Sequence, residues 1–314
     1  MGDSVKRIEV CAFYSCEQLV VVIMGDNVTI IEDNAFQHCY ALKFIRLSKT
    51  LEVIGSCAFQ FCDSLEVLIL PPTVEKIHYS ALNGCELLRI LILPDTISPD
   101  NLGSKLISYS DLNRNATDFG NVDYSYNGDG YVELGEGEGV PPATEESNTE
   151  VNEWLMSYMD EYPFHKLCYN VNVNTQKIND YLNDNGNGND NGNGSQSAAQ
   201  LDPYHGMTPL HMLAVNPHAP ADTLSGNLLL HGSGSGSGSA NTIHMDTVFV
   251  EDNQGNTPID YARQYNVPGL LKMVEMLCMN RMNNASVNAN ANVRKQQQQQ
   301  QGDVIIRKRK LSDK

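Results

Sequence analysis

Residues 54–71, IGSCAFQFCDSLEVLILP, contain the pattern that predicts the fold of the N-terminal part of this 314-residue chain. Four of its residues, Ile54, Ala58, Cys62 and Leu65, have an identical residue at steps of 23 residues before and after them. Four columns in register over four units indicate a solenoid, because a unit of this length cannot bury its own apolar side and must stack on its neighbours. The columns are Ile8, Ile31, Ile54 and Ile77; Ala12, Ala35, Ala58 and Ala81; Cys16, Cys39, Cys62 and Cys85; and Leu19, Leu42, Leu65 and Leu88.

The unit resembles the BspA-like class of leucine-rich repeats, in which an I…AF..C..L..I.LP pattern recurs. This resemblance covers about the first third of the chain and implies a solenoid with a β-rich concave face, used for binding rather than catalysis. We therefore expect a leucine-rich-repeat solenoid of four coils over residues 1–97. The first coil departs from the pattern, since Met24-Gly25 stands where the pattern has Leu-Pro. The chain also begins almost inside a coil, so that end is expected to fray or to be covered.

Residues between the core positions of each strand predict a binding surface. Side chains alternate along a strand, so if Leu65, Leu68 and Leu70 point inward, Val67 and Ile69 face solvent. Seven of the eight such positions are apolar, and an exposed apolar stripe is typical of an interaction surface. Two other interpretations stay open: Val and Ile simply suit strands, or the acidic segment that follows folds back over them. The predicted partner-binding stripe is Val21, Ile23, Phe44, Arg46, Val67, Ile69, Ile90 and Ile92.

The cysteine column is predicted to be structural. Stacking brings these thiols close together, which would also suit a redox switch or a metal ladder. One Cys in every 23 residues lacks the paired CxxC spacing of a zinc site, however, and free buried Cys behaves as a small hydrophobe. We expect buried free thiols, with no metal and no cofactor.

The rest of the chain is strongly acidic in places. The formal charge is −17, which argues against a protein that coats nucleic acid with its whole surface. Residues 98–150 combine Gly, Asn and acid without periodicity and predict an acidic flexible linker. Residues 125–136 resemble an EF-hand loop, but Ser125 stands where the motif has Asp and no exiting helix can follow. A solvated loop is therefore the preferred interpretation.

Residues 151–282 resemble degenerate ankyrin repeats and predict a mainly α-helical module. Three fragments resemble one another: residues 163–168, PFHKLC, residues 206–214, GMTPLHMLA, and residues 255–262, GNTPIDYA. The second is close to the ankyrin opening G-x-TPLHxAA, the third is degenerate, and an Asn/Gly insertion at 183–195 interrupts the first unit. In such a unit the Thr caps the first helix and the Pro occupies its first turn. Thr208 and Thr257 are 49 residues apart, and the Gly/Ser insertion at 231–239 explains the excess over the ankyrin period. Leucine-rich and ankyrin-like repeats occur together in families of unicellular algae, which this chain resembles.

The histidines and one cysteine of this region raise a metal or catalytic alternative. His165 and Cys168 belong to one helical stretch, with no Asn or Asp placed to orient a dyad. The resemblance implies that His211 hydrogen-bonds the backbone between repeats. The structural interpretation is preferred for all of them, and no catalytic residue is expected. The set is His165, His205, His211, His218 and Cys168.

Residues 283–314 are Asn- and Gln-rich and predict a disordered tail with a basic end. With no signal-peptide run and no uninterrupted apolar run of membrane length, we expect a cytoplasmic protein with no membrane partner. The function predicted is a scaffold or adaptor that binds unidentified protein partners through the concave stripe and the ankyrin-like repeats. The alternative is a nuclear or nucleic-acid-associated factor directed by Arg307, Lys308, Arg309 and Lys310.

Overall fold

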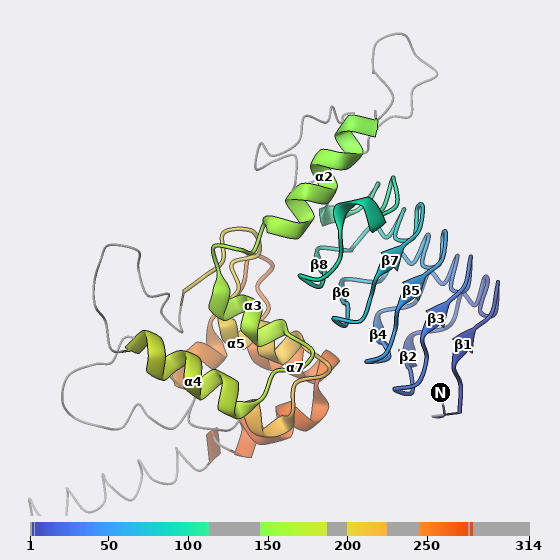
Figure 1. Cartoon of the computed structure of the whole chain (residues 1–314). Helices are drawn as coiled ribbons and strands as arrows, with labels where there is room; N and C mark the ends of the chain where they lie inside the picture. Colours follow the sequence, from blue (N-terminus) through green and yellow to red (C-terminus); the bar gives the residue numbers. More distant parts are fainter. Residues whose placement is uncertain are drawn as a thin grey trace, which may run out of the picture.

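The computed structural model describes residues 2, 4–112, 145–186, 200–224, 245–275 and 277–278. Its N-terminal part is a solenoid of parallel strands, drawn in blue to green in Figure 1. Strands that pair lie 23 residues apart in the sequence, as in the partners Val21 and Phe44, or Val67 and Ile90. One side carries the four-stranded sheet β1 (Arg7–Ile8), β3 (Ile30–Ile31), β5 (Val53–Ile54) and β7 (Lys76–Ile77). The concave side carries β2 (Val21–Ile23) paired with β4 (Phe44–Arg46), and β6 (Val67–Ile69) paired with β8 (Ile90–Ile92).

The predicted columns form the core of the solenoid. The Ile column is buried in every coil, and the Ala, Cys and Leu columns are fully buried in the second to fourth coils. Phe13, Phe36 and Phe59 stack face to face, with ring centroids 5.0 and 5.3 Å apart and interplanar angles of 3°. The repeat period therefore places equivalent side chains on top of one another, as the sequence predicts.

The solenoid continues beyond the predicted end at residue 97. Leu102 forms a parallel bridge with Ile77, and the amide of Leu82 donates to the carbonyl of Leu106 at 3.1 Å. Leu106 and Leu112 are buried. A short 3₁₀ helix, η1 (Pro99–Asn101), takes up the extra residues of this fifth coil. The prediction that the linker begins at residue 98 is wrong, because the fifth coil breaks the sequence period while keeping its stacking.

A helical region follows. Its helices are α2 (Glu145–Ser157), α3 (Pro163–Tyr169), α4 (Thr175–Gly186), α5 (Pro209–Val215) and α7 (Pro258–Tyr265), with 3₁₀ helices η2 (Ala221–Leu224) and η3 (Met245–Phe249). Residues 267–275 are helical as well. Helices α5 and α7 begin as predicted: Thr208 and Thr257 accept a hydrogen bond from the third residue of the helix, and proline fills the first turn.

Helix α2 begins inside the segment predicted as linker, so the prediction of a linker as far as residue 150 is also wrong. Residues 113–144, with the EF-hand-like stretch, lie outside the described residues, as does the whole predicted tail, residues 283–314. Among the described residues, none of the helices combines the length and the apolarity that crossing a membrane requires.

The helical region packs directly against the solenoid (Figure 1). Helix α2 meets the fifth coil, where the Asn152 side-chain amide donates to the Leu102 carbonyl at 3.4 Å. The Tyr158 hydroxyl donates to the carbonyl of Leu91 in β8 at 3.2 Å. Lys166 forms an ion pair with Asp95 at 2.7 Å. The described residues thus contradict the picture of two separate modules on a flexible tether.

Candidate functional site

The predicted binding stripe changes from exposed to buried along the solenoid. Val21 and Ile23 in β2 are each 51% exposed, and Phe44 and Arg46 in β4 are half-buried. The last four residues are buried, with exposed fractions of 6% or less: Val67, Ile69, Ile90 and Ile92. The predicted alternation itself holds, since Val22, Ile45, Leu68 and Leu91 point into the core.

The prediction that Val67, Ile69, Ile90 and Ile92 face a partner in solvent is therefore wrong, because the chain's own helical region covers them. The Tyr265 ring of α7 meets the Phe44 ring edge-on, with centroids 5.6 Å apart. Burial first, and then the nearby Glu66 carboxylate, raise the pKa of Tyr265. One helical turn earlier, the ring of Tyr261 lies 5.3 Å from the Arg89 guanidinium carbon. Two aromatic side chains of α7 thus lie against the concave face.

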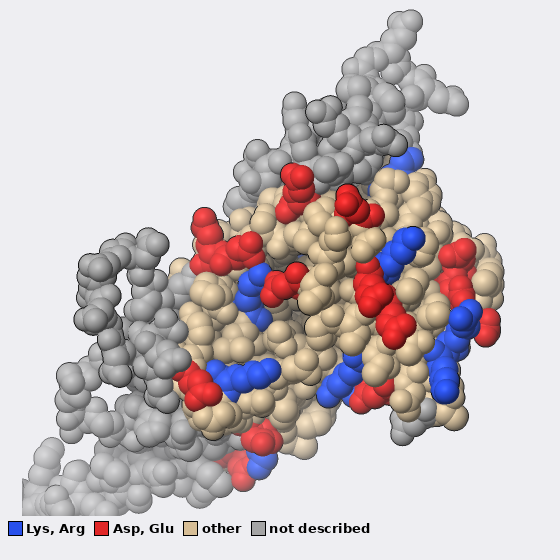
Figure 2. Space-filling view, viewed as in Figure 1, with Lys and Arg blue, Asp and Glu red and all other residues tan. Residues whose placement is uncertain are grey.

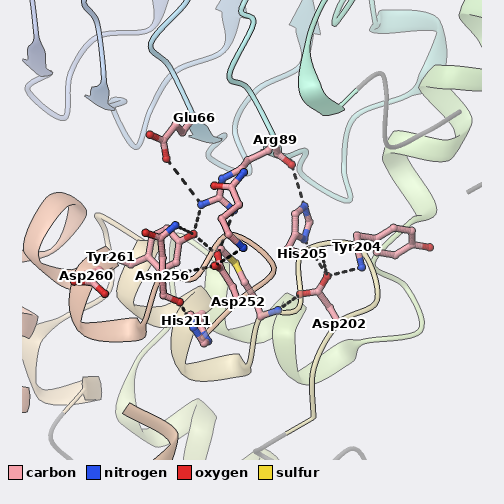
Figure 3. A network of polar contacts seen from close by, with 12 residues as sticks. Glu66, Arg89, Asp202, Tyr204, His205, His211, Asp252, Asn256, Asp260 and Tyr261 are labelled. Atoms are coloured by element: carbon pink, nitrogen blue, oxygen red, sulfur yellow. Dashed lines mark hydrogen bonds and ion pairs between the residues drawn. The ribbon is translucent and has the colours of Figure 1, made fainter. Parts of the chain in front are cut away.

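The residue before β8, Arg89, anchors this contact (Figure 3). Arg89 is buried, and its Nη1 lies 3.5 Å from Oδ2 of Asp252, whose side chain is fully buried. Arg89 also donates to the Tyr261 hydroxyl, which in turn donates to Asp252. The Glu66 carboxylate lies 3.9 Å from Nη2. Removing one member of such a network leaves a buried charge without its counter-ion, which is strongly destabilising.

The carboxylate of Asp252 also orders the loop that carries it. Its Oδ1 accepts hydrogen bonds from the backbone amides of Gln254 and Asn256, both at 2.9 Å. These contacts shape the turn that leads into the Thr257 cap of α7. The same carboxylate therefore builds a turn of the helical region and binds the solenoid.

A second anchor lies beside the first. His205 Nε2 is 2.9 Å from the Arg89 carbonyl, and Nδ1 is 3.0 Å from Asp202 Oδ1. The ring thus lies between an acceptor of the solenoid and an acceptor of the helical region. Burial opposes ionisation of Asp202, but hydrogen bonds from His205 and from the backbone amides of His205 and Met207 outweigh it and lower its pKa. Figure 3 shows this pair next to the Arg89 network.

Two of the remaining histidines are structural. His165 Nε2 lies 3.0 Å from the Met207 carbonyl. His211 Nε2 lies 3.2 Å from the Asn256 carbonyl, which joins the two Thr-Pro units as predicted. Burial raises the pKa of the Cys168 thiol well above its usual value, which disfavours a nucleophilic thiolate. Among the described residues, no three His, Cys, Asp or Glu side chains are grouped to hold a metal ion.

His218 differs from them because it is buried while both ring nitrogens lack a hydrogen-bond partner. Burial, helped by Arg46 and Lys49 and opposed by Asp26, lowers its pKa to about 4. The neutral ring therefore sits beside the basic residues of the second coil. Because Arg46 is a half-buried member of the stripe, His218 lies near the boundary between the exposed and the buried part of the stripe.

The cysteine column is buried in the second to fourth coils, as predicted. Each of these thiols donates to the carbonyl of a phenylalanine in the preceding coil, at 3.1–3.3 Å. Burial raises the pKa of Cys39 to about 11 and that of Cys62 well above its usual value. Cys16, in the first coil, is exposed.

A family model agrees with this description of the solenoid. Residues 1–113 match the BspA type leucine rich repeat region, in six copies. A Treponema pallidum (T. pallidum) leucine-rich repeat protein of known crystal structure is 30% identical over 34% of this chain and 49% of its own, with a TM-score of 0.32. A leucine-rich repeat protein from Bacteroides ovatus is 34% identical over 35% of this chain and 28% of its own, with a TM-score of 0.33. This chain thus spans half or less of these two proteins. No curated protein matches the sequence.

The sequence analysis missed the residues that join the two regions. Arg89 and Glu66 occupy one column of the repeat, one place before each strand, and the column holds Lys43 and Val20 in the earlier coils. Opposite charges in consecutive coils, next to an apolar stripe, are the signal that was available. The sequence around Asp252 contains no such signal, because Asp is common in turns.

Proposed function

We propose that this protein is a non-enzymatic interaction protein that binds a protein partner on the uncovered start of its concave stripe. This surface, called the open stripe below, consists of Val21, Ile23 and Phe44 beside Arg46. The observation that carries the proposal is the change in exposure along one continuous stripe, from 51% at Val21 to 0% at Ile90. Exposed apolar side chains in a row are typical of interaction surfaces, and leucine-rich repeat proteins generally mediate protein interactions.

The covered half of the stripe indicates the chemistry that suits the open half. Helix α7 covers the later coils with aromatic rings and meets Phe44 with the edge of Tyr265. A partner that lays an apolar helix face along β2 and β4 would continue this contact. Arg46 and Asp26, paired at 3.2 Å, form a polar rim for it.

We also propose that the helical region consists of two degenerate ankyrin-like units. Support comes from the repeated arrangement of an Asp-anchored turn, a Thr cap, a proline and a short helix at Asp202–Val215 and Asp252–Tyr265. The contact of His211 with the next unit agrees with it. These units differ from those of a free-standing repeat array, because one of their sides covers the solenoid.

A cytoplasmic location remains part of this proposal. The nuclear alternative rests on Arg307–Lys310, which lie outside the described residues. On the face drawn in Figure 2, the described Lys and Arg side chains lie scattered among Asp and Glu, which does not favour a nucleic-acid surface there.

Site-specific photo-crosslinking tests the open stripe. A photoreactive phenylalanine analogue replaces Val21 in one variant and the exposed Tyr79 in the control, and each is irradiated in a lysate of the source cells. We expect a discrete adduct from position 21 that disappears when Ile23→Lys is added, and no such adduct from position 79. Adducts of the same size from both positions, or an adduct that survives Ile23→Lys, would contradict the proposal.

A further inference from the structure

A second surface lies on the turns of the solenoid, away from the concave stripe. It combines four aromatic rings with carboxylates and is called the aromatic–acid patch below. Tyr14 and Tyr40 are 48% and 40% exposed, and the other members are half-buried except for the exposed Glu86. The patch consists of Tyr14, His38, Tyr40, Phe61, Asp63 and Glu86.

The rings are held together around His38. Its imidazole stacks on Phe61 with centroids 4.9 Å apart and an interplanar angle of 13°. Tyr14 meets it edge-on at 5.6 Å. Tyr40 lies at 5.5 Å and its hydroxyl is 2.9 Å from Nδ1. The rings of three consecutive turns thus form one surface with fixed spacing rather than separate exposed side chains.

Gly84 leaves room for this arrangement. It follows Phe61 in the repeat, and a Cβ atom at Gly84 would lie 2.4 Å from Cδ1 of the Phe61 ring. Its φ of +74° also favours glycine over other residues. The fourth coil therefore supplies no ring of its own and lets Phe61 lie over its backbone.

Carboxylates border the rings. Tyr40, Asp63 and Glu86 occupy one column of the repeat, and the amide of Ser64 donates to the Tyr40 carbonyl, which joins these turns. Glu17 holds the same position in the first coil. Burial first, and then the neighbouring Glu86, raise the pKa of Asp63 to about 6, against the opposing effect of His38. The negative charges here repel one another, and a cation would relieve this repulsion.

We propose that the aromatic–acid patch binds an arginine side chain presented by an extended peptide segment of a partner protein. A guanidinium over the Tyr40 ring gains a cation–π contact. Its planar edge then faces the Asp63 carboxylate, which it can bind through two parallel hydrogen bonds. Lysine offers a point charge without this planar geometry and suits the site less well. The net charge of −17 attracts basic segments to the protein in the first place.

Fluorescence anisotropy with the full chain tests the proposal. The probes are three fluorescein-labelled peptides of the form GSXGSXGS, in which X is arginine, lysine or the neutral arginine analogue citrulline. Tyr40→Ala and Asp63→Asn remove the ring and the charge of the site. Tyr79→Ala and Glu75→Gln are the matched controls, since both residues are exposed members of other columns. Thermal melts check that all four variants are folded, and Tyr14→Ala replaces Tyr40→Ala if that variant is not.

We expect the arginine peptide to bind, the lysine peptide to bind about 5-fold more weakly and the citrulline peptide not to bind. Each patch variant should weaken the arginine peptide by about 5-fold or more, while the controls stay within about 2-fold of the unmodified protein. The proposal is overturned if the unmodified protein does not bind the arginine peptide at millimolar concentration. It is equally overturned if control and patch variants lose the same affinity, because bulk charge then explains the binding. Neither result bears on the open stripe, which lies on a different face.

Discussion

Strands β2 and β8 occupy equivalent positions in the first and fourth coils, and both consist entirely of aliphatic residues. In β2 the two outward side chains are half-exposed, whereas in β8 the equivalent Ile90 and Ile92 are buried under the helical region. The sequence pattern of the two strands is the same, so it fixes the direction of each side chain but says nothing of what lies opposite. A repeat protein can thus present one half of a stripe as a surface and use the other half as core.

The polar residues beside the strands show the same contrast. Arg46 pairs with the half-exposed Asp26 at the open stripe, and Arg89 pairs with the fully buried Asp252 under the helices. The first ion pair is screened by water, and the second is not. Four predictions test the contrast between the open and the covered coils.

The largest effect is expected from a charge placed under the helical region. Ile90→Lys should lower the free energy of unfolding by about 4 kcal/mol or more, because the ammonium group has no route to water. Val21→Lys at the equivalent position should change it by at most about 0.5 kcal/mol. Urea unfolding followed by the fluorescence of Trp154, the single tryptophan, measures both. Equal losses would mean that the first coil is covered as well.

The next effect concerns the two ion pairs. Arg89→Met should destabilise the protein by about 3 kcal/mol, since Asp252 remains buried without its cation, and Asp252→Asn should restore part of the loss. Arg46→Met is the matched control and should cost less than about 1 kcal/mol. Chemical denaturation of the single and double variants gives the coupling. A cost of Arg89→Met no larger than that of Arg46→Met would show that the buried network does not hold the two regions together.

A smaller, pH-dependent effect is expected from His218 at the edge of the cover. Its pKa of about 4 in the folded protein lies below the value of about 6.5 in the unfolded chain. The unfolded state therefore takes up the proton first, and stability is lost as the pH falls from about 6.5 towards 4, by about 2 kcal/mol at pH 5. His218→Leu should remove this part of the slope in unfolding experiments between pH 7 and 5. Asp63 titrates in the same range in both proteins and cancels in the difference. An unchanged slope would contradict the buried, neutral state of the ring.

The smallest effect separates the first coil from the later ones through the cysteine column. Cys62→Ala should cost about 1 kcal/mol, because it leaves a small cavity and removes a weak hydrogen bond to the Phe36 carbonyl. Cys16→Ala at the exposed equivalent position should be neutral within about 0.5 kcal/mol. In the native protein a thiol reagent should label Cys16 at once and Cys62 only after unfolding. Fast labelling of Cys62 would show that the stacked coils open readily.

The repeat made much of the solenoid predictable. The step of 23 residues identified the columns, and alternation along the strands correctly placed Leu68 inside. The Thr-Pro pairs located the starts of α5 and α7. The fifth coil escaped prediction, because its chain step from Ile77 to Leu102 departs from the period while its backbone still pairs.

The extent of the open stripe, and the residues that set its limit, could not be predicted from the repeat. Exposure depends on which distant segment packs on a strand, and the contact between Arg89 and Asp252 joins residues from separate regions of the sequence. Neither residue stands in a motif that would relate it to the other.

The period of the solenoid, its core columns and the direction of each strand side chain follow from the sequence alone, because all of these are local properties that repeat along the chain. Which coils remain open depends instead on the folded molecule, since it follows from long-range packing of α7 and the buried pairing of Arg89 with Asp252. Packing of this kind depends on shape and charge across two surfaces that no short-range pattern encodes.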